Sequence, residues 1–260
     1  MTYLLSALLM IRVGGTYNVS TNESKESPWS IIRGMIFGGV HYLRTSLFGG
    51  LVFLKLSGGL MYGGIDVLNV SFAERGGEEG KSARLGILFA TMGIGNLIGP
   101  LVADRFTDMT QPRSIQLACL YGFAVSVFGL FMMSLFRPFW VICVLSGVRA
   151  MGSTIVWINS SLLMQKFSTP NMLGRVTAMD YALALTGEGA SAVVAGVLQD
   201  RGLDAEGVTL RLAIFGTLLT LLWTFYHFSG KGAGFKEGPK RARSNDYLET
   251  LSLAHSHSDS

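Results

Sequence analysis

Residues 139–165 read FWVICVLSGVRAMGSTIVWINSSLLMQ, an apolar stretch that contains a single charged side chain, Arg149. A helix rises about 1.5 Å per residue, so a stretch of this length is long enough for the roughly 30 Å hydrocarbon core of a bilayer. The stretch therefore predicts a membrane-spanning helix, and the remainder of the chain decides how many others accompany it.

Five further stretches have the same apolar character: residues 46–71, 85–103, 114–136, 181–199 and 212–229. Only four of the 21 Lys and Arg and 17 Asp and Glu residues lie within the six stretches. The runs are unbroken, which excludes a transmembrane β-barrel, because barrel strands alternate in polarity over about 10 residues. We therefore predict an all-α polytopic membrane protein, with a six-transmembrane-helix bundle over residues 46–229.

The segments outside the bundle have different compositions. Residues 1–13 predict the remnant of a preceding membrane helix, and residues 14–45 predict a cytoplasmic loop that carries an amphipathic helix. Residues 230–260 predict a disordered tail. Thirteen Lys and Arg residues lie on the side of this tail and six on the opposite side. The positive-inside rule therefore predicts a cytoplasmic C-terminus. We expect the membrane to be the plasma membrane. The net charge of +4 is too small to indicate a nucleic-acid partner.

Charged residues within the membrane mark candidate functional positions, because each costs about 2.5–3.5 kcal/mol on insertion scales without a partner or a water-filled cavity. The four are Lys55, Asp66, Arg149 and Glu188. Counting from the span ends places Asp66 about 16 Å above Lys55 and the other three near the midplane. We interpret Lys55 and Arg149 as substrate-binding residues in a central cavity, for an anionic or acceptor-rich molecule. Glu188 and Asp66 are candidates for proton coupling or for an ion pair, and the alternative is a buried ion pair that only fixes helix packing.

The connection after the second stretch reads GPLVADRFTD over residues 99–108. Gly99, Leu101, Asp104 and Arg105 correspond to residues of the G-x-L-x-D-R-x-G-R loop signature, with one additional residue before Asp104, and this connection resembles that of the major facilitator superfamily. The last two positions of the signature are not matched. The resemblance implies that Gly99, Asp104 and Arg105 form a conformational latch with a neighbouring helix.

A second motif, FSTPNMLGRV over residues 167–176, looks like the T-P-x-x-L-R-G-R-V loop between helices ten and eleven of the drug and siderophore exporter branch, which is related to enterobactin and macrolide efflux proteins. The resemblance covers about residues 1–229. It implies that the chain corresponds to helices seven to twelve, the C-terminal half of a twelve-helix major facilitator fold. In that fold helices seven and ten line the central cavity, which would place Lys55 and Arg149 there.

The resemblance implies transmembrane transport of a small organic molecule, as efflux by secondary active, proton-coupled alternating access. The implied partners are the lipid bilayer, the substrate, protons, and an opposing half supplied by a homodimer or by a missing N-terminal half. The alternative is a truncated or non-transporting half-transporter that acts only through association with another membrane subunit. The sequence contains neither a G-x-S-x-G nor an H-E-x-x-H motif, so we expect no enzyme, no metal and no cofactor.

Overall fold

The structure is a computed structural model of the 260-residue chain, and it describes residues 46–75, 77, 79–168 and 170–228. All of these belong to one compact unit, Gly38–Ser260. The predictions made for residues 1–45 and 230–260 lie outside the described residues.

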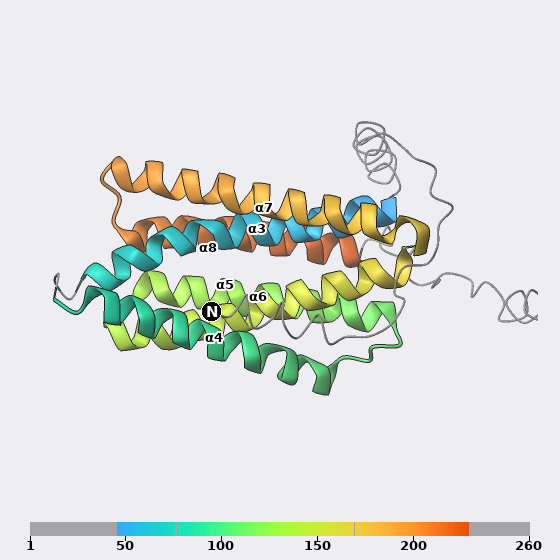
Figure 1. Cartoon of the computed structure of the whole chain (residues 1–260), viewed down its shortest axis with the longest axis horizontal. Coiled ribbons are helices and arrows are strands. Elements are labelled where there is room, and N and C mark those ends of the chain that lie inside the picture. Colours follow the sequence, from blue (N-terminus) through green and yellow to red (C-terminus); the bar gives the residue numbers. More distant parts are fainter. Residues whose placement is uncertain (1–45, 76, 78, 169, 229–260) are drawn as a thin grey trace, which may run out of the picture. The chain divides into compact units, whose positions relative to one another are not determined.

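The described part of the chain folds into six helices and contains no strand (Figure 1). The helices are α3 (Ser46–Glu74), α4 (Lys81–Phe106), α5 (Pro112–Leu135), α6 (Phe139–Phe167), α7 (Pro170–Asp200) and α8 (Ala205–Phe228). The predicted all-α polytopic bundle is confirmed.

Five of these helices, α4 to α8, are long and apolar enough to cross a membrane. Within its described residues α3 is not among them, although its apolar stretch predicts a span. Lys55, Asp66 and Asn69 reduce its apolarity. The outer surface of the bundle suits lipid, because it exposes large apolar side chains such as Phe89 and Leu97 of α4.

The helix of the fifth predicted span extends well beyond its apolar stretch. The apolar pattern begins the fifth span at residue 181, whereas α7 begins at Pro170, so the motif at residues 167–176 lies mostly within a helix rather than in a loop. The first three turns of α7 carry polar residues, among them Thr177 and Asp180. These residues lower the apolarity of the segment without preventing a helix, and proline at the first helical position favours a helix start.

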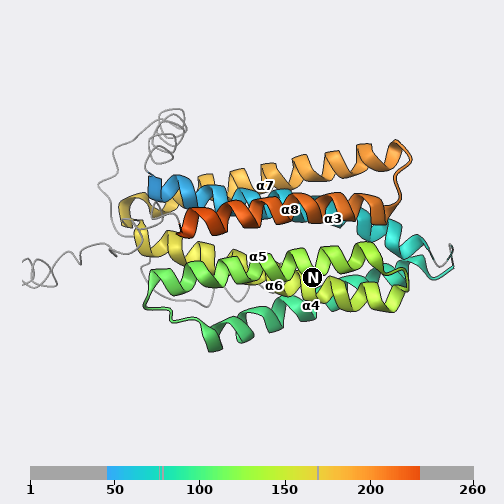
Figure 2. The same ribbon diagram turned by 180° about the vertical axis from the view of Figure 1, so that it is seen from behind.

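The helices pack as two groups of three, with α3 between α7 and α8 in one group and α6 between α4 and α5 in the other (Figures 1 and 2). Glycine allows the closest approaches. A Cβ at Gly59 or Gly63 of α3 would meet the backbone carbonyl of Ala184 or Glu188 on α7, and a Cβ at Gly95 of α4 would meet the Gly147 carbonyl on α6.

The connections between helices lie at alternate ends of the bundle. At one end, Glu206 at the start of α8 forms ion pairs with Arg75 after α3 and with Arg137 before α6, the latter at 3.7 Å. At the opposite end, Lys166 near the end of α6 donates to the carbonyl of Met109 in the α4–α5 connection. Consecutive helices therefore run antiparallel, as the predicted series of spans requires.

Candidate functional site

Helices α3, α4, α6 and α7 enclose a pocket of about 220 Å³. We call it the Arg149 pocket. The polar and aromatic residues that line it include Tyr62, Asp66, Asn96, Arg149, Trp157 and Glu188. Three of the four charged residues predicted to lie within the membrane therefore meet in one place.

Helical spacing explains why these side chains share the pocket. Tyr62 and Asp66 are four residues apart on α3, and Arg149, Ser153 and Trp157 follow at intervals of four on α6. Residues at this interval lie on one face of a helix. Since consecutive helices alternate in direction, α3 and α6 are antiparallel, so Asp66 near the end of α3 lies level with Arg149 in the first half of α6.

The guanidinium of Arg149 is buried and poorly satisfied. Arg149 is 2% exposed, its Nε has no hydrogen-bond partner among the described residues, and its Nη2 donates only to Met92 Sδ, at 3.8 Å. Within the described residues no carboxylate lies within ion-pair distance of it. An arginine has five N–H donors, so a buried guanidinium with so few partners is suited to a ligand with oxygen acceptors.

Two carboxylates line the same pocket from neighbouring helices. Asp66 on α3 is exposed and Glu188 on α7 is partly buried. Arg149 attracts the Asp66 carboxylate, and Asp66 and Glu188 repel each other. The pocket therefore combines one cation with two anions, which can hold a proton or a cationic group as well as an acceptor.

Lys55 lies in a separate cluster, which we call the Lys55 cluster and define as Lys55, Trp157, Ser161, Asp180 and Tyr181. Lys55 is 1% exposed, and its Nζ lies 2.7 Å from Asp180 Oδ2 and 2.8 Å from Ser161 Oγ. The same atom lies 4.5 Å from the ring centroids of both Trp157 and Tyr181. Lys55 is not among the residues that line the Arg149 pocket, and its substrate-binding role stays a prediction.

Sequence reasoning missed the partner of Lys55. Asp180 precedes residue 181, where the apolar stretch begins, so the apolar pattern places it outside the membrane. It lies ten residues after Pro170 and is well inside α7. Tyr62 could have been found because it lies one helical turn from Asp66. Asn96 is a polar residue within an otherwise apolar stretch, which is a usable signal.

The residues of the predicted latch lie near the end of α4. Gly99 packs against α6, where a Cβ would lie 2.6 Å from the Met151 carbonyl oxygen, and Asp104 and Arg105 are exposed. Beyond the helix, the hydroxyl and the backbone N–H of Thr110 donate to Asp108 at 2.6 and 2.8 Å. These hydrogen bonds lower the pKa of Asp108 and keep this connection negatively charged. The latch role stays a prediction.

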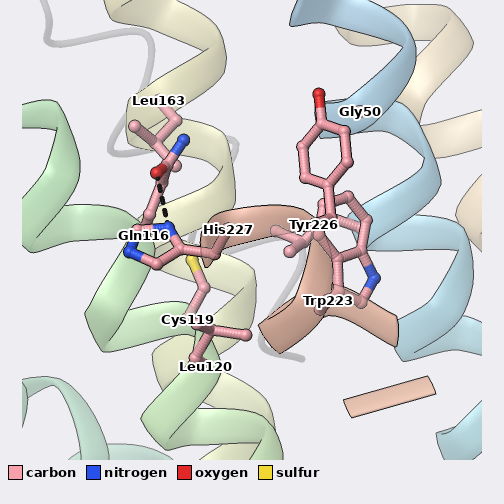
Figure 3. Close-up of a pocket in the computed structure, with 9 residues that line it drawn as sticks. Gly50, Gln116, Cys119, Leu120, Leu163, Trp223, Tyr226 and His227 are labelled. Carbon is pink, nitrogen blue, oxygen red and sulfur yellow. Dashed lines mark hydrogen bonds between the residues drawn. The ribbon is translucent and has the colours of Figure 1, made fainter. Parts of the chain in front are cut away.

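A second cavity, of about 20 Å³, lies between α3, α5, α6 and α8 (Figure 3). His227 and Gln116 form a 3.0 Å hydrogen bond at its wall, and Trp223 and Tyr226 lie opposite. The space suits a single water molecule rather than an organic ligand. Two larger hollows, at the α4–α5 and α4–α6 contacts, have largely apolar linings without charged residues. The Arg149 pocket is therefore the best candidate site.

The chain is similar to the enterobactin exporter EntS of Escherichia coli O1:K1 / APEC, with 28% identity over 213 residues that cover 77% of this chain and 47% of the relative. The enterobactin exporters EntS of Escherichia coli O45:K1 (strain S88 / ExPEC) and O139:H28 (strain E24377A / ETEC) match with the same identity and coverage. The chain thus spans about half the length of the curated relatives it matches. No protein-family model and no solved structure matches the chain.

Proposed function

We propose that this chain forms part of a membrane exporter of a small organic molecule, and that its cargo binds in the Arg149 pocket. One observation carries the proposal: a buried guanidinium with unfilled donors lines a pocket together with two carboxylates, within a bundle of membrane helices. Ionisable groups in such positions typically mark substrate or ion pathways. Similarity to an exporter over 77% of the chain supports transport rather than catalysis.

The proposed mechanism is alternating access of the major facilitator type. The six described helices correspond to one half of such a fold, in which two six-helix units rock around a site between them. The opposing unit is a second copy of this chain or an N-terminal half. The protein acts in the plasma membrane with its C-terminus in the cytoplasm. In the alternative, the chain transports nothing itself and acts only through association with another membrane subunit.

Replacing Arg149 by glutamine tests the proposal. We expect the initial rate of export to fall about tenfold or more, because a neutral amide cannot replace the charge-assisted hydrogen bonds to the cargo. The rate is measured in proteoliposomes with an imposed proton gradient. Enterobactin, the cargo in the name of the relatives, and ethidium serve as probes.

Arg211→Gln is the matched control, because Arg211 is exposed on α8 and donates to Gly207 of its own helix. Equal rates in Arg149→Gln and in the unaltered chain would contradict a role for the pocket. Absence of transport by the unaltered chain, both alone and after co-expression with an N-terminal half, would favour the alternative.

Proton coupling is a separate prediction, centred on Glu188. Asp66 and Glu188 repel each other, so one of them favours proton uptake when no cationic group of a ligand lies between them. We expect a protonophore to abolish export, and Glu188→Gln to remove the dependence of its rate on pH. Asp66→Asn identifies whether the second carboxylate shares the proton, and Asp200→Asn at the exposed end of α7 is the control. An unchanged pH dependence in both pocket variants would exclude this coupling.

A further inference from the structure

The charges of the Arg149 pocket do not cancel. Arg149 contributes one positive charge, while Asp66 and Glu188 contribute two negative charges. None of the three forms an ion pair within 4.0 Å in the described part of the chain, although Asp66 interacts electrostatically with both others. In contrast, the buried Lys55 cluster holds one cation and one anion in direct contact. The pocket is the place where charge remains available to a ligand.

The buried guanidinium of Arg149, at the wall of the pocket, has too few hydrogen-bond acceptors within the described part of the chain. Arg149 is 2% exposed, and its Nε has no partner among the described residues. Leaving a buried donor unpaired is unfavourable, and more so when the group is charged. A carboxylate or another oxygen anion of a ligand satisfies this donor.

The carboxylates need a donor. Asp66 and Glu188 come from adjacent helices, α3 and α7, and repel each other. A protonated amine placed between them relieves this repulsion and forms charge-assisted hydrogen bonds. A ligand with only an anionic group leaves the surplus negative charge in place, and a ligand with only an amine leaves Arg149 unsatisfied.

We infer that the Arg149 pocket binds an amphoteric ligand, one that carries an oxygen anion for Arg149 and a protonated amine for Asp66 and Glu188. This deepens the proposed function and rests on it, since the pocket is where the cargo binds. The volume of about 220 Å³ is below the roughly 300–1,000 Å³ typical of sites for drug-sized molecules. The pocket therefore accommodates a ring-sized molecule, or one such portion of a larger cargo, with the indole of Trp157 at its wall.

Three probes built on one benzene ring separate the possibilities: 4-(aminomethyl)benzoate, benzoate and benzylamine. Dissociation constants are measured by ligand-observed NMR with the full chain in lipid nanodiscs, without any transport step. We expect 4-(aminomethyl)benzoate to bind about tenfold or more tightly than either single-charge probe. Arg149→Gln removes the advantage over benzylamine, and Glu188→Gln removes the advantage over benzoate. Arg211→Gln and Asp200→Asn, each outside the pocket, retain both advantages.

The comparison of the three probes with the unaltered chain decides the inference even where a variant fails to fold. Benzoate binding as tightly as the amphoteric probe would mean that a proton neutralises the second carboxylate, and would overturn the inference. Benzylamine binding as tightly, or no binding of any probe at about 10 mM, would also overturn it. The predicted binding pattern without transport would refute the proposed function alone, whereas transport without this pattern would refute the amphoteric ligand alone.

Discussion

Replacing Asp180 by asparagine lowers the free energy of unfolding by about 3–5 kcal/mol, and adding Lys55→Met to that variant restores most of the loss. The single replacement leaves a buried ammonium without a carboxylate, with the neutral amide of the new asparagine, a serine hydroxyl and two aromatic rings as neighbours. The double replacement removes both charges together, so no uncompensated charge remains inside the bundle. Unfolding in detergent micelles is followed by circular dichroism for Asp180→Asn, Lys55→Met, the double variant and the unaltered chain. The four measurements form a double-mutant cycle.

A second Lys–acid pair in the same chain is the control. Lys81 and Glu74 pair near the connection between α3 and α4, where their side chains are 32% and 44% exposed. Glu74→Gln should change the stability by less than about 1 kcal/mol, because exposed ion pairs contribute little. Additive effects of Lys55→Met and Asp180→Asn, with no recovery in the double variant, would show that the pair does not act as a unit.

A side chain introduced at Gly63 would push α3 away from α7. The Cβ of alanine at this position would lie 2.5 Å from the carbonyl carbon and the Cα of Glu188, and would meet the carbonyl oxygen of the same residue. These are backbone atoms of a helix, which cannot rotate away as a side chain does. We expect Gly63→Ala to destabilise the bundle by about 3 kcal/mol or more and to weaken ligand binding, because Glu188 moves with its backbone.

Gly93→Ala and Gly189→Ala are matched controls, because no atom lies within 4 Å of a Cβ at either position. Both should be neutral or slightly stabilising, since alanine favours a helix by about 1 kcal/mol over glycine. Thermal unfolding of the three variants and their yield of monodisperse protein provide the comparison. A Gly63→Ala chain as stable as the Gly93→Ala chain would contradict the packing described for α3 and α7.

The sequence predicted the helices well because lipid imposes a simple rule on composition. It predicted the contacts between charged residues less well, because depth was counted from the edges of apolar runs. The ion pair between Lys55 and Asp180 shows that they lie at the same height in two parallel helices, and Asp180 lies ten residues after Pro170. The apolar pattern does not indicate that α7 begins at Pro170, so it does not predict the contact between Lys55 and Asp180.

Asp66 illustrates the same limit. Counting along the helices puts Arg149 and Glu188 at the depth of Lys55 and Asp66 about 16 Å higher, whereas the pocket brings Asp66, Arg149 and Glu188 together. The proximity of Asp66 to Arg149 and Glu188 depends on the axial register of α3 against α6 and α7. Close backbone contacts at glycines such as Gly59 and Gly63 determine that register. Sequence periodicity describes one helix at a time and does not contain that register.

Trp157 belongs to both clusters, because its ring lies against the Lys55 ammonium and also lines the Arg149 pocket. The indole therefore lies between the Lys55 cluster, whose two charges are paired, and the Arg149 pocket, whose charges form no ion pair among the described residues. Its ring is further held by an edge contact to Tyr181, with centroids 5.3 Å apart. These contacts hold the indole in place and give the Arg149 pocket a fixed aromatic wall.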